Sequence, residues 1–240
     1  PFPTLPHTMP KPTLRLHHEL LLLALHDERG SMAFGRMIDL GLGGALLTEL
    51  LIEERIRIVE TKRLLGAARI VEVLDATPVG SPVLDDALAA LAGSSRRPST
   101  QHAVSRLSRM SGLRRRVASE LARHGVLREK EETVLLLFRR RRYPTLDPAP
   151  ERALVARIRK ALESRTEVAP RTAALISLAD LTRTLDAVYT RSEQRALRPR
   201  IRTLGDDIGG SQALKDAIQA ANAAMVAAVA AATAASAASR

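Results

Sequence analysis

Apolar residues recur at helical spacing along most of the chain, and this spacing predicts its main elements. Residues 13–25 form the first predicted helix, whose leucine stripe leaves three polar side chains expected to face water: Arg15, His18 and Glu19. The second predicted helix, Phe34–Glu54, carries three glycines within its apolar stripe: Gly41, Gly43 and Gly44. Each glycine costs about 1 kcal/mol relative to alanine inside a helix. Close helix packing is the favoured explanation, and approach of the backbone to a ligand is the alternative.

Further along the chain, the same spacing predicts more helices: Pro82–Leu91, Thr100–His124 with a break at Ser111-Gly112, Ala149–Ser164, Pro170–Tyr189 and Ser211–Ala238. Two short β-branched segments, Ile56–Val59 and Ala68–Leu74, are typical of strands. Glu132–Phe138 and Arg139–Tyr143 are predicted to form the two arms of a hairpin.

The composition favours helices packed on helices, because only 2% of the residues are aromatic and leucine and alanine must build the core. We predict a mainly α fold: a single compact helical domain over residues 14–240, with a few short strands and a β-hairpin, behind a disordered leader at residues 1–13. No secretory signal is expected at the proline-rich start. The alanine-rich stretch Ala217–Ser239 is expected to be a buried or partner-covered helix and not a membrane span.

Positive charge dominates the composition, with a formal net charge of +11. Between Arg96 and Arg142, fourteen Lys and Arg residues stand against four Glu, so this segment alone carries +10 and the remainder is nearly neutral. Such a concentration favours an anionic partner, which can be a lipid headgroup, a nucleic acid or an acidic protein.

The sequence offers no recognisable catalytic set. It contains no Cys, its six His residues are scattered, and it lacks nucleophile-elbow, P-loop and HExxH patterns. The glycines at 41–44 fall within a predicted helix, so they do not form a dinucleotide-binding turn. We therefore predict no enzyme activity, no metal site and no cofactor.

The arginines near the middle of the chain are the strongest candidates for binding. If residues 112–124 form one helix, Arg109, Arg116 and Arg123 line up opposite its apolar stripe as a basic ridge, which is either solvated or anion-binding. Arg114 instead lies at the edge of the apolar stripe, where a guanidinium needs either an internal carboxylate or a bound anion. The sequence leaves both alternatives open.

The predicted hairpin combines apolar and basic residues. The apolar run Val134–Phe138 leads directly into four consecutive arginines. An apolar segment beside clustered cations is typical of a membrane surface, and a core strand followed by a charged turn is the alternative. The residues predicted to contact a membrane or a partner are Leu136, Phe138, Arg139, Arg140, Arg141 and Arg142.

Several segments carry a combined signature: Leu20–Leu25 followed by Asp27–Gly30, Gly41–Leu50 leading into Arg55-Ile56, Pro82–Leu88, Leu121–Leu127 and Ala174–Ala179. In this order and spacing they resemble the Golgi phosphoprotein 3 family of phosphoinositide-binding membrane adaptors, which includes many bacterial members. The resemblance implies a mostly helical domain with a small hairpin and no known catalysis. It also implies binding of phosphatidylinositol 4-phosphate through a Trp and an Arg near the second helix and two basic residues on a later helix.

By that resemblance, the Trp position falls near Gly35 and Arg36, and the Arg position on the second helix is Gly43. The two later basic positions correspond to Ser111 and Arg114. The headgroup-binding residues predicted on this basis are Arg114, Arg36, Arg109 and Arg115.

These observations predict a cytoplasmic, peripheral membrane adaptor on the inner face of the membrane, with an anionic phospholipid of the phosphoinositide type as its partner. A second copy of the chain is a further candidate partner. One alternative is a winged-helix-like nucleic-acid-binding protein, because residues 112–124 and the basic hairpin have that local pattern. The scarcity of aromatic residues for base stacking disfavours nucleic acid. The other alternative is a scaffold for acidic protein tails.

Overall fold

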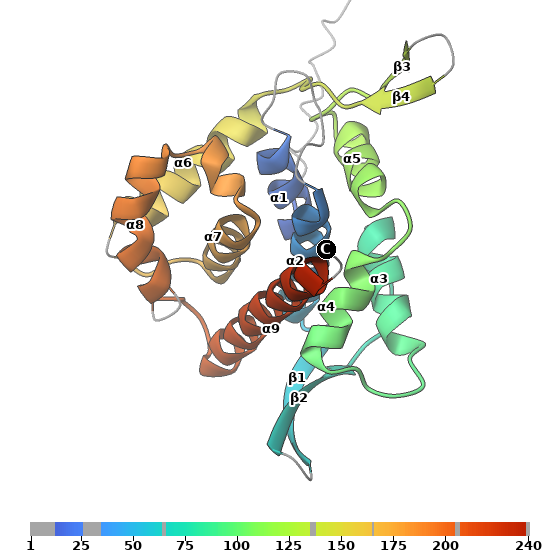
Figure 1. Ribbon diagram of the computed structural model, residues 1–240, viewed down its shortest axis with the longest axis vertical. Helices are drawn as coiled ribbons and strands as arrows, with labels where there is room; N and C mark the ends of the chain where they lie inside the picture. The colour runs from blue at the N-terminus through green and yellow to red at the C-terminus, as the bar shows by residue number, and fades with distance from the viewer. Residues whose placement is uncertain are drawn as a thin grey trace, which may run out of the picture.

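Helices α1 (Leu16–Ala24) and α2 (Gly35–Ile52) lie in the middle of the molecule, and the other helices pack around them (Figure 1). Two β-hairpins project from opposite ends. This computed structural model describes residues 13–25, 35–63, 66–134, 138–164, 166–204 and 207–238. In chain order its elements are α1 (Leu16–Ala24), α2 (Gly35–Ile52), β1 (Ile56–Arg63), β2 (Gly66–Val73), α3 (Pro82–Ala92), α4 (Thr100–Ser108), α5 (Leu113–Arg123), β3 (Lys130–Val134), β4 (Phe138–Arg142), α6 (Ala149–Glu163), α7 (Pro170–Thr182), the 3-10 helix η1 (Thr184–Ala187), α8 (Arg191–Thr203) and α9 (Gln212–Ala238). The predicted mainly α fold is confirmed.

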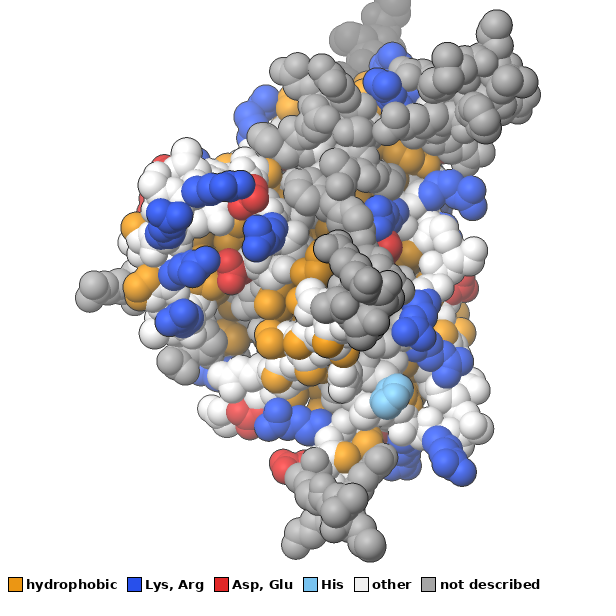
Figure 2. Space-filling view, in the orientation of Figure 1, with side chains coloured by type: hydrophobic (Ala, Val, Ile, Leu, Met, Phe, Trp, Pro, Cys, Tyr) orange, Lys and Arg blue, Asp and Glu red, His pale blue; other side chains and the backbone are white. Residues whose placement is uncertain are grey.

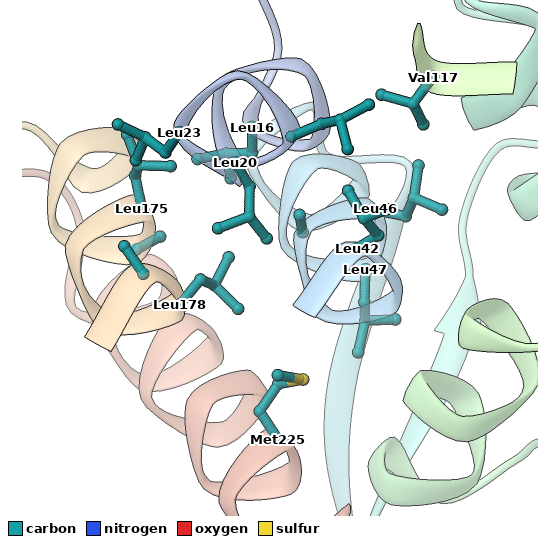
Figure 3. Packing of buried hydrophobic residues seen from close by; sticks show 14 of the residues in the cluster. Leu16, Leu20, Leu23, Leu42, Leu46, Leu47, Val117, Leu175, Leu178 and Met225 are labelled. Atoms are coloured by element: carbon teal, nitrogen blue, oxygen red, sulfur yellow. The ribbon is translucent and has the colours of Figure 1, made fainter. Parts of the chain in front are cut away.

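Helix α1 is buried on every side, because all nine of its residues lie in the interior. It contacts α2, α5, α6 and α7, and its leucines meet those of α2 and α7 at the centre of the core (Figure 3). The prediction that His18 and Glu19 face water is therefore wrong, since they are 1% and 5% exposed. A leucine stripe indicates one covered face, but it does not show that neighbours cover the opposite face as well. Arg15, just before the helix, is partly buried and pairs with Glu53 at 2.8 Å.

The glycines of α2 let three helices approach it closely. A Cβ at Gly43 would lie 2.7 Å from the carbonyl oxygen of Val104 and 2.8 Å from the backbone nitrogen of Ser108, both in α4. Cβ atoms at Gly41 and Gly44 would likewise overlap side chains of α7 and α9. Contacts this short leave no room for a side chain. The close-packing explanation is thus the one that the structure supports.

Both predicted strand segments near residues 56–74 are confirmed, and they pair with each other. Strands β1 and β2 form an antiparallel hairpin in which Ile56 stands opposite Val73. Ile56 and Val71 are buried, so the base of this hairpin is anchored in the core.

The predicted break between α4 and α5 is also confirmed. Gly112 has a φ of +62°, a left-handed conformation that favours glycine. The chain turns at this point, so that α4 packs on α2 and α9 whereas α5 packs on α1.

The second hairpin is present, but the predicted boundary between its arms is wrong. Val134 pairs with Phe138, so Phe138 begins the second strand and does not end the first. Residues 135–137 connect the two strands and lie outside the described residues. The apolar run from 134 to 138 contains none of the residues that favour turns, so the sequence carries no signal for a reversal inside it.

The predicted helix Pro170–Tyr189 is shorter in the structure. Helix α7 ends at Thr182, where Arg183 takes a left-handed conformation with φ +60°, and η1 follows. Helix α8 is not among the predicted helices. None of its residues is fully buried, so its sequence contains few of the apolar residues on which the prediction depends. The predicted helix Ser211–Ala238 is confirmed as α9. No helix in the described part of the chain combines the length and the apolarity that a bilayer crossing requires.

Replacing Gly43 with alanine is expected to lower the free energy of unfolding by roughly 1–3 kcal/mol, because the added Cβ meets α4 backbone that cannot rotate away. Helix propensity alone would raise it by about 1 kcal/mol, so the sign of the change tests the packing. Chemical denaturation measures the difference. Gly93→Ala, at the exposed end of α3, is the matched control and should change stability by only about 0.5 kcal/mol. A Gly43→Ala protein as stable as the wild type would contradict the close-packing argument.

Candidate functional site

Three of the arginines predicted to bind a headgroup lie around one corner, where α4 ends and α5 begins. Arg109 caps the C-terminus of α4 and is exposed, and Arg114 and Arg115 lie in the first turn of α5. Arg36 lies in the first turn of α2, which packs against this corner, but its side chain falls outside the described part. The structure therefore brings these positions into one region, and their role in binding stays a prediction.

Arg114 has an internal carboxylate partner. Its Nε donates to Asp39 Oδ1 at 2.5 Å and its Nη2 donates to Asp39 Oδ2 at 2.6 Å, which joins α5 to α2. Bidentate pairs of this kind are the strong form of a charge-assisted hydrogen bond. The two side chains are 22% and 31% exposed. The sequence leaves open whether Arg114 pairs with an internal carboxylate or with a bound anion, and the structure contains the internal carboxylate. A phosphate reaches Arg114 only by sharing or displacing Asp39.

The other two pocket positions implied by the family resemblance hold no cation. At Gly43 the backbone of α4 occupies the space into which a side chain would project. An arginine there would have to push α2 and α4 apart. Ser111 is exposed and uncharged. The pocket therefore differs from the family pattern at both positions.

A basic hollow lies beside this corner, between the loop after α3 and helix α4. We call it the α4 hollow; it has a volume of about 400 Å³, and its cations are Arg96, Arg106 and Arg109. Arg106 donates to Ser94 Oγ at 2.6 Å. Among the described residues, Arg96 and Arg109 have no ion-pair partner. A phosphate group in the hollow would meet guanidinium groups on more than one side.

The predicted basic ridge is only partly free to bind an anion. Figure 2 shows Lys and Arg side chains spread over α3, α4 and α5 on one face of the molecule. Arg116 pairs with Asp86 of α3, and Arg123, which is 63% exposed, lies 3.5 Å from Glu120. Arg109 is therefore the ridge member with the least internal compensation.

The backbone register of the second hairpin pairs glutamate positions with arginine positions. The register places Glu131 opposite Arg141 and Glu132 opposite Arg140. Pairs of opposite charge at such positions contribute roughly 0.2–1 kcal/mol in hairpins generally. The predicted contact residues whose side chains lie outside the described part are Leu136, Phe138, Arg139, Arg140 and Arg141. Their contacts stay a prediction.

A buried polar cluster around Glu120 is the feature that sequence reasoning missed. Glu120 Oε2 lies 2.8 Å from His18 Nε2 and 3.5 Å from His17 Nε2. The Glu120 carboxylate also accepts hydrogen bonds from the backbone N–H of Val83 at 3.0 Å and from the Ser81 hydroxyl at 3.1 Å. The cluster therefore ties α1 to α3 and α5.

Burial and hydrogen bonding together determine the protonation of this cluster. It lowers the pKa of His17 to about 3, although the nearby Glu120 carboxylate opposes the shift. Burial alone raises the pKa of Glu120, but the nearby His17 and the hydrogen bonds from His18 and the Val83 N–H together hold it well below the usual range for a glutamate. At neutral pH the cluster thus contains an ionised carboxylate beside a neutral His17.

The same three residues form a potential metal-binding set. His17, His18 and Glu120 place their ligand atoms within 4.8 Å of one another, and Zn²⁺ accepts two imidazoles and a carboxylate. However, the backbone N–H of Arg15 donates to His18 Nδ1 at 3.2 Å, so the proton of a neutral His18 lies on Nε2 and points at Glu120. A metal at Nε2 would move that proton to Nδ1, where it would face the Arg15 N–H. The cluster therefore fits an internal hydrogen-bond network better than a metal site.

Two further buried carboxylates near α1 use arginines internally. Glu49 accepts the Leu16 N–H at 2.9 Å and pairs with Arg171 at 2.7 Å. Glu19 pairs with Arg157 at 2.7 Å. Burial raises the pKa of both carboxylates, and the arginines oppose that shift. Arg157 and Arg171 are consequently structural and do not add to a phosphate-binding surface.

Known proteins match most of this structure in sequence. The family described as Golgi phosphoprotein 3 (GPP34) matches residues 16–221, from the start of α1 into α9. Vacuolar protein sorting-associated protein 74 of Eremothecium gossypii is 31% identical over 188 residues, which cover 68% of this chain and 55% of that protein. The protein of the same name from Schizosaccharomyces pombe is 30% identical over 173 residues, covering 65% of this chain and 50% of that protein. The chain thus spans about half the length of these relatives.

The buried His17 should make the fold sensitive to acid. Its pKa is about 3 in the folded state and 6.5 in the unfolded state, so between these values only the unfolded state binds the proton. The contribution of His17 to the free energy of unfolding therefore falls as the pH drops below 6.5, by at most about 1.4 kcal/mol per pH unit for one proton, and the raised pKa of Glu19 and Glu49 acts in the opposite direction. His17→Leu should flatten this slope. Burial also lowers the pKa of His124, so a smaller slope should persist.

Urea denaturation between neutral pH and the ordinary pKa of glutamate measures the slope. Glu120 contributes its own acid sensitivity only below that range, because its lowered pKa matters when the unfolded carboxylate begins to protonate. The exposed His102 provides the control variant, His102→Gln. An unchanged slope in His17→Leu would show that His17 does not govern the acid response.

Proposed function

Because the chain belongs to the Golgi phosphoprotein 3 family, we propose that it is a peripheral membrane adaptor that binds anionic phospholipid headgroups. The headgroup implied by the family resemblance is phosphatidylinositol 4-phosphate. We place the protein on the cytoplasmic face of a membrane and assign it no catalytic step.

The α4 hollow is the observation that carries this proposal. Arg96, Arg106 and Arg109 line one depression of about 400 Å³, and Arg109 also belongs to the corner where the family resemblance places the headgroup site. Arg115 and Arg36 lie on the adjoining first turns of α5 and α2. Each basic residue close to an anionic membrane contributes about 1 kcal/mol, so a few unpaired arginines are enough for salt-sensitive docking.

The altered pocket bears on selectivity. Gly43 and Ser111 provide no cation, and Arg114 is engaged with Asp39. In our proposal the phosphate therefore lies further out, toward Arg109 and the α4 hollow. A site formed by surface arginines recognises charge more than the shape of the sugar ring, and we expect the protein to accept several anionic phospholipids.

The hairpin supplies a second proposed contact with the membrane. Its apolar residues, with Leu136 and Phe138 among them, would enter the lipid interface while Arg139–Arg142 meet the phosphates. Fully covering one Leu or Phe side chain is worth about 1.5–3 kcal/mol, which is enough to add to the electrostatic docking. Contact with a second copy of the chain is the alternative, and four arginines on each copy would oppose it.

Arg109→Glu should weaken binding to vesicles that contain phosphatidylinositol 4-phosphate by roughly tenfold or more. The change removes one cation and adds one anion, each worth about 1 kcal/mol at such a surface. Arg152→Glu makes the same change on an exposed part of α6 and should bind nearly as well as the wild type. Co-sedimentation at low and high salt measures both, because a shorter Debye length weakens electrostatic docking.

Two results would oppose this proposal. Equal capture by neutral and anionic vesicles at low salt would remove the electrostatic basis, and equal losses in the two variants would remove the special role of the corner. Tighter binding to duplex DNA than to any vesicle would favour the nucleic-acid alternative.

Changing Leu136 and Phe138 together to serine should lower vesicle binding and leave molecular mass and thermal stability nearly unchanged. The reason is that both side chains would lose apolar contact with lipid but no contact within the fold. Leu74→Ser is the matched control, because Leu74 is 50% exposed and follows the other hairpin. A collapse of stability would assign the two residues to the core. A change in molecular mass would assign them to a subunit contact.

A further inference from the structure

A groove between the end of α7 and helix α8 gathers arginines from two elements. We call it the α8 groove; it has a volume of about 420 Å³, and its cations are Arg183, Arg191, Arg195, Arg198 and Arg202. Figure 2 shows a group of Lys and Arg side chains over α7 and α8, apart from those over α3, α4 and α5. This concentration lies outside residues 96–142, where the sequence analysis expected the anionic partner to bind.

Four of the five arginines of α8 are not needed to hold the helix in place. Arg191, Arg195, Arg198 and Arg202 recur at intervals of three or four residues, so they share one face of the helix. The helix is anchored elsewhere: Arg200 pairs with Asp207 and donates to a backbone carbonyl of α6, and Leu197 packs against the core. The arginine row is therefore available to a ligand.

Arg183 faces this row from the end of α7, in a conformation that costs free energy. Its φ of +60° and ψ of +20° lie in the left-handed region, at the position that usually holds glycine at the end of a helix. A residue with a side chain costs about 1 kcal/mol or more there. An arginine does not stabilise the backbone in this conformation, but its guanidinium adds a positive charge to the groove.

The charge of the groove is only partly compensated internally. Within the described residues, none of the five guanidinium groups has a carboxylate within ion-pair distance. The groove contains two carboxylates, Asp180 and Asp186, and Asp186 accepts a hydrogen bond from Gln194 at 2.8 Å. Five like charges around one depression repel one another, and a bound polyanion would relieve that repulsion.

We propose that the α8 groove binds a phosphorylated polyol that carries more than one phosphate. Guanidinium forks match phosphate oxygens in a bidentate manner, and several of them here face one space. The volume falls within the range of about 300–1,000 Å³ typical of small-ligand sites. The carboxylates of Asp180 and Asp186 repel phosphate but accept hydrogen bonds from hydroxyl groups, so the ligand needs hydroxyls beside its phosphates. No described aromatic side chain lines the groove, which disfavours stacked nucleic-acid bases.

This site is separate from the α4 hollow and does not depend on the proposed membrane function. The same chemistry occurs in a soluble polyol phosphate and in a phosphorylated lipid headgroup. Two arms of one experiment distinguish these sources: calorimetric titration with inositol hexakisphosphate, and co-sedimentation with phosphatidylcholine vesicles that contain phosphatidylinositol bisphosphate.

Arg183→Gly and Arg195→Gln should each weaken binding of inositol hexakisphosphate by about tenfold, because each removes one charge-assisted contact. Arg183→Gly should also keep or raise the thermal midpoint, since glycine suits a φ of +60°. Loss of affinity without loss of stability separates a binding role from a structural one. The control is Arg152→Gln on the exposed part of α6, which should titrate like the wild type.

A parallel loss of vesicle binding in Arg183→Gly and Arg195→Gln would support the proposal with a lipid as the source, and a loss confined to the soluble probe would support a free polyol phosphate. Wild-type affinity in both variants would overturn the proposal. Displacement of inositol hexakisphosphate by sulfate at matched charge would also overturn the proposal, because it would show that the groove recognises negative charge and not a phosphorylated polyol. Displacement by polyglutamate more readily than by the polyol phosphate would also overturn it, in favour of an acidic protein partner.

Discussion

Helix α1 has no side that faces water, and the positions of the helices around it follow from this constraint. Polar groups buried on such a helix are costly unless they have internal partners, and three of those at α1 have one. Glu120 of α5 holds His18, Arg157 of α6 holds Glu19, and Glu49 of α2 caps the start of α1. Each of these three helices is thereby fixed to α1 by a directed contact as well as by leucine packing. Removing one partner would leave a buried group unpaired, at a cost of about 1–3 kcal/mol. This cost selects one arrangement among the many ways in which leucine-rich helices can pack.

The glycines of α2 extend that constraint to the candidate site. At Gly43 the backbones of α2 and α4 are so close that no side chain fits between them. The position that the family resemblance assigns to an arginine is therefore used for packing in this chain. Asp39, one turn earlier, pairs with Arg114 and ties α5 to the same helix. Where the family resemblance places the headgroup pocket, α2 therefore packs directly against α4 and α5. The cations that stay available, such as Arg109, lie on the outer side of the corner.

Sequence reasoning predicted what depends on one element alone and missed what depends on its neighbours. The break near Gly112 was predictable because glycine favours a left-handed turn, and its φ of +62° bears this out. The burial of His18 and Glu19 was not, because helical periodicity cannot show how many faces are covered. Helix α8 turns only Leu197 and Ile201 toward the core and has no fully buried residue, so its apolar face is too small for a hydrophobic pattern to reveal. For Arg114, position at an apolar edge correctly indicated a need for a partner, but which partner depends on how α2 packs against α5.

Whether an arginine belongs to the scaffold or to a binding surface is decided by its partner. Arg200 and Arg195 lie five residues apart on α8, yet Arg200 pairs with Asp207 whereas Arg195 lines a groove in which arginines outnumber carboxylates. Helix α8 contains five Arg and one Glu. It nevertheless belongs to the part of the chain outside residues 96–142, whose net charge is nearly zero. Carboxylates elsewhere in the sequence cancel the charge of α8 in the net total, but most of them do not lie next to its arginines. A ligand responds to charges within a Debye length of about 8 Å, so distant carboxylates do not cancel the groove. Local sets of unpaired guanidinium groups, and not the net charge of +11, therefore determine where an anion can bind this protein.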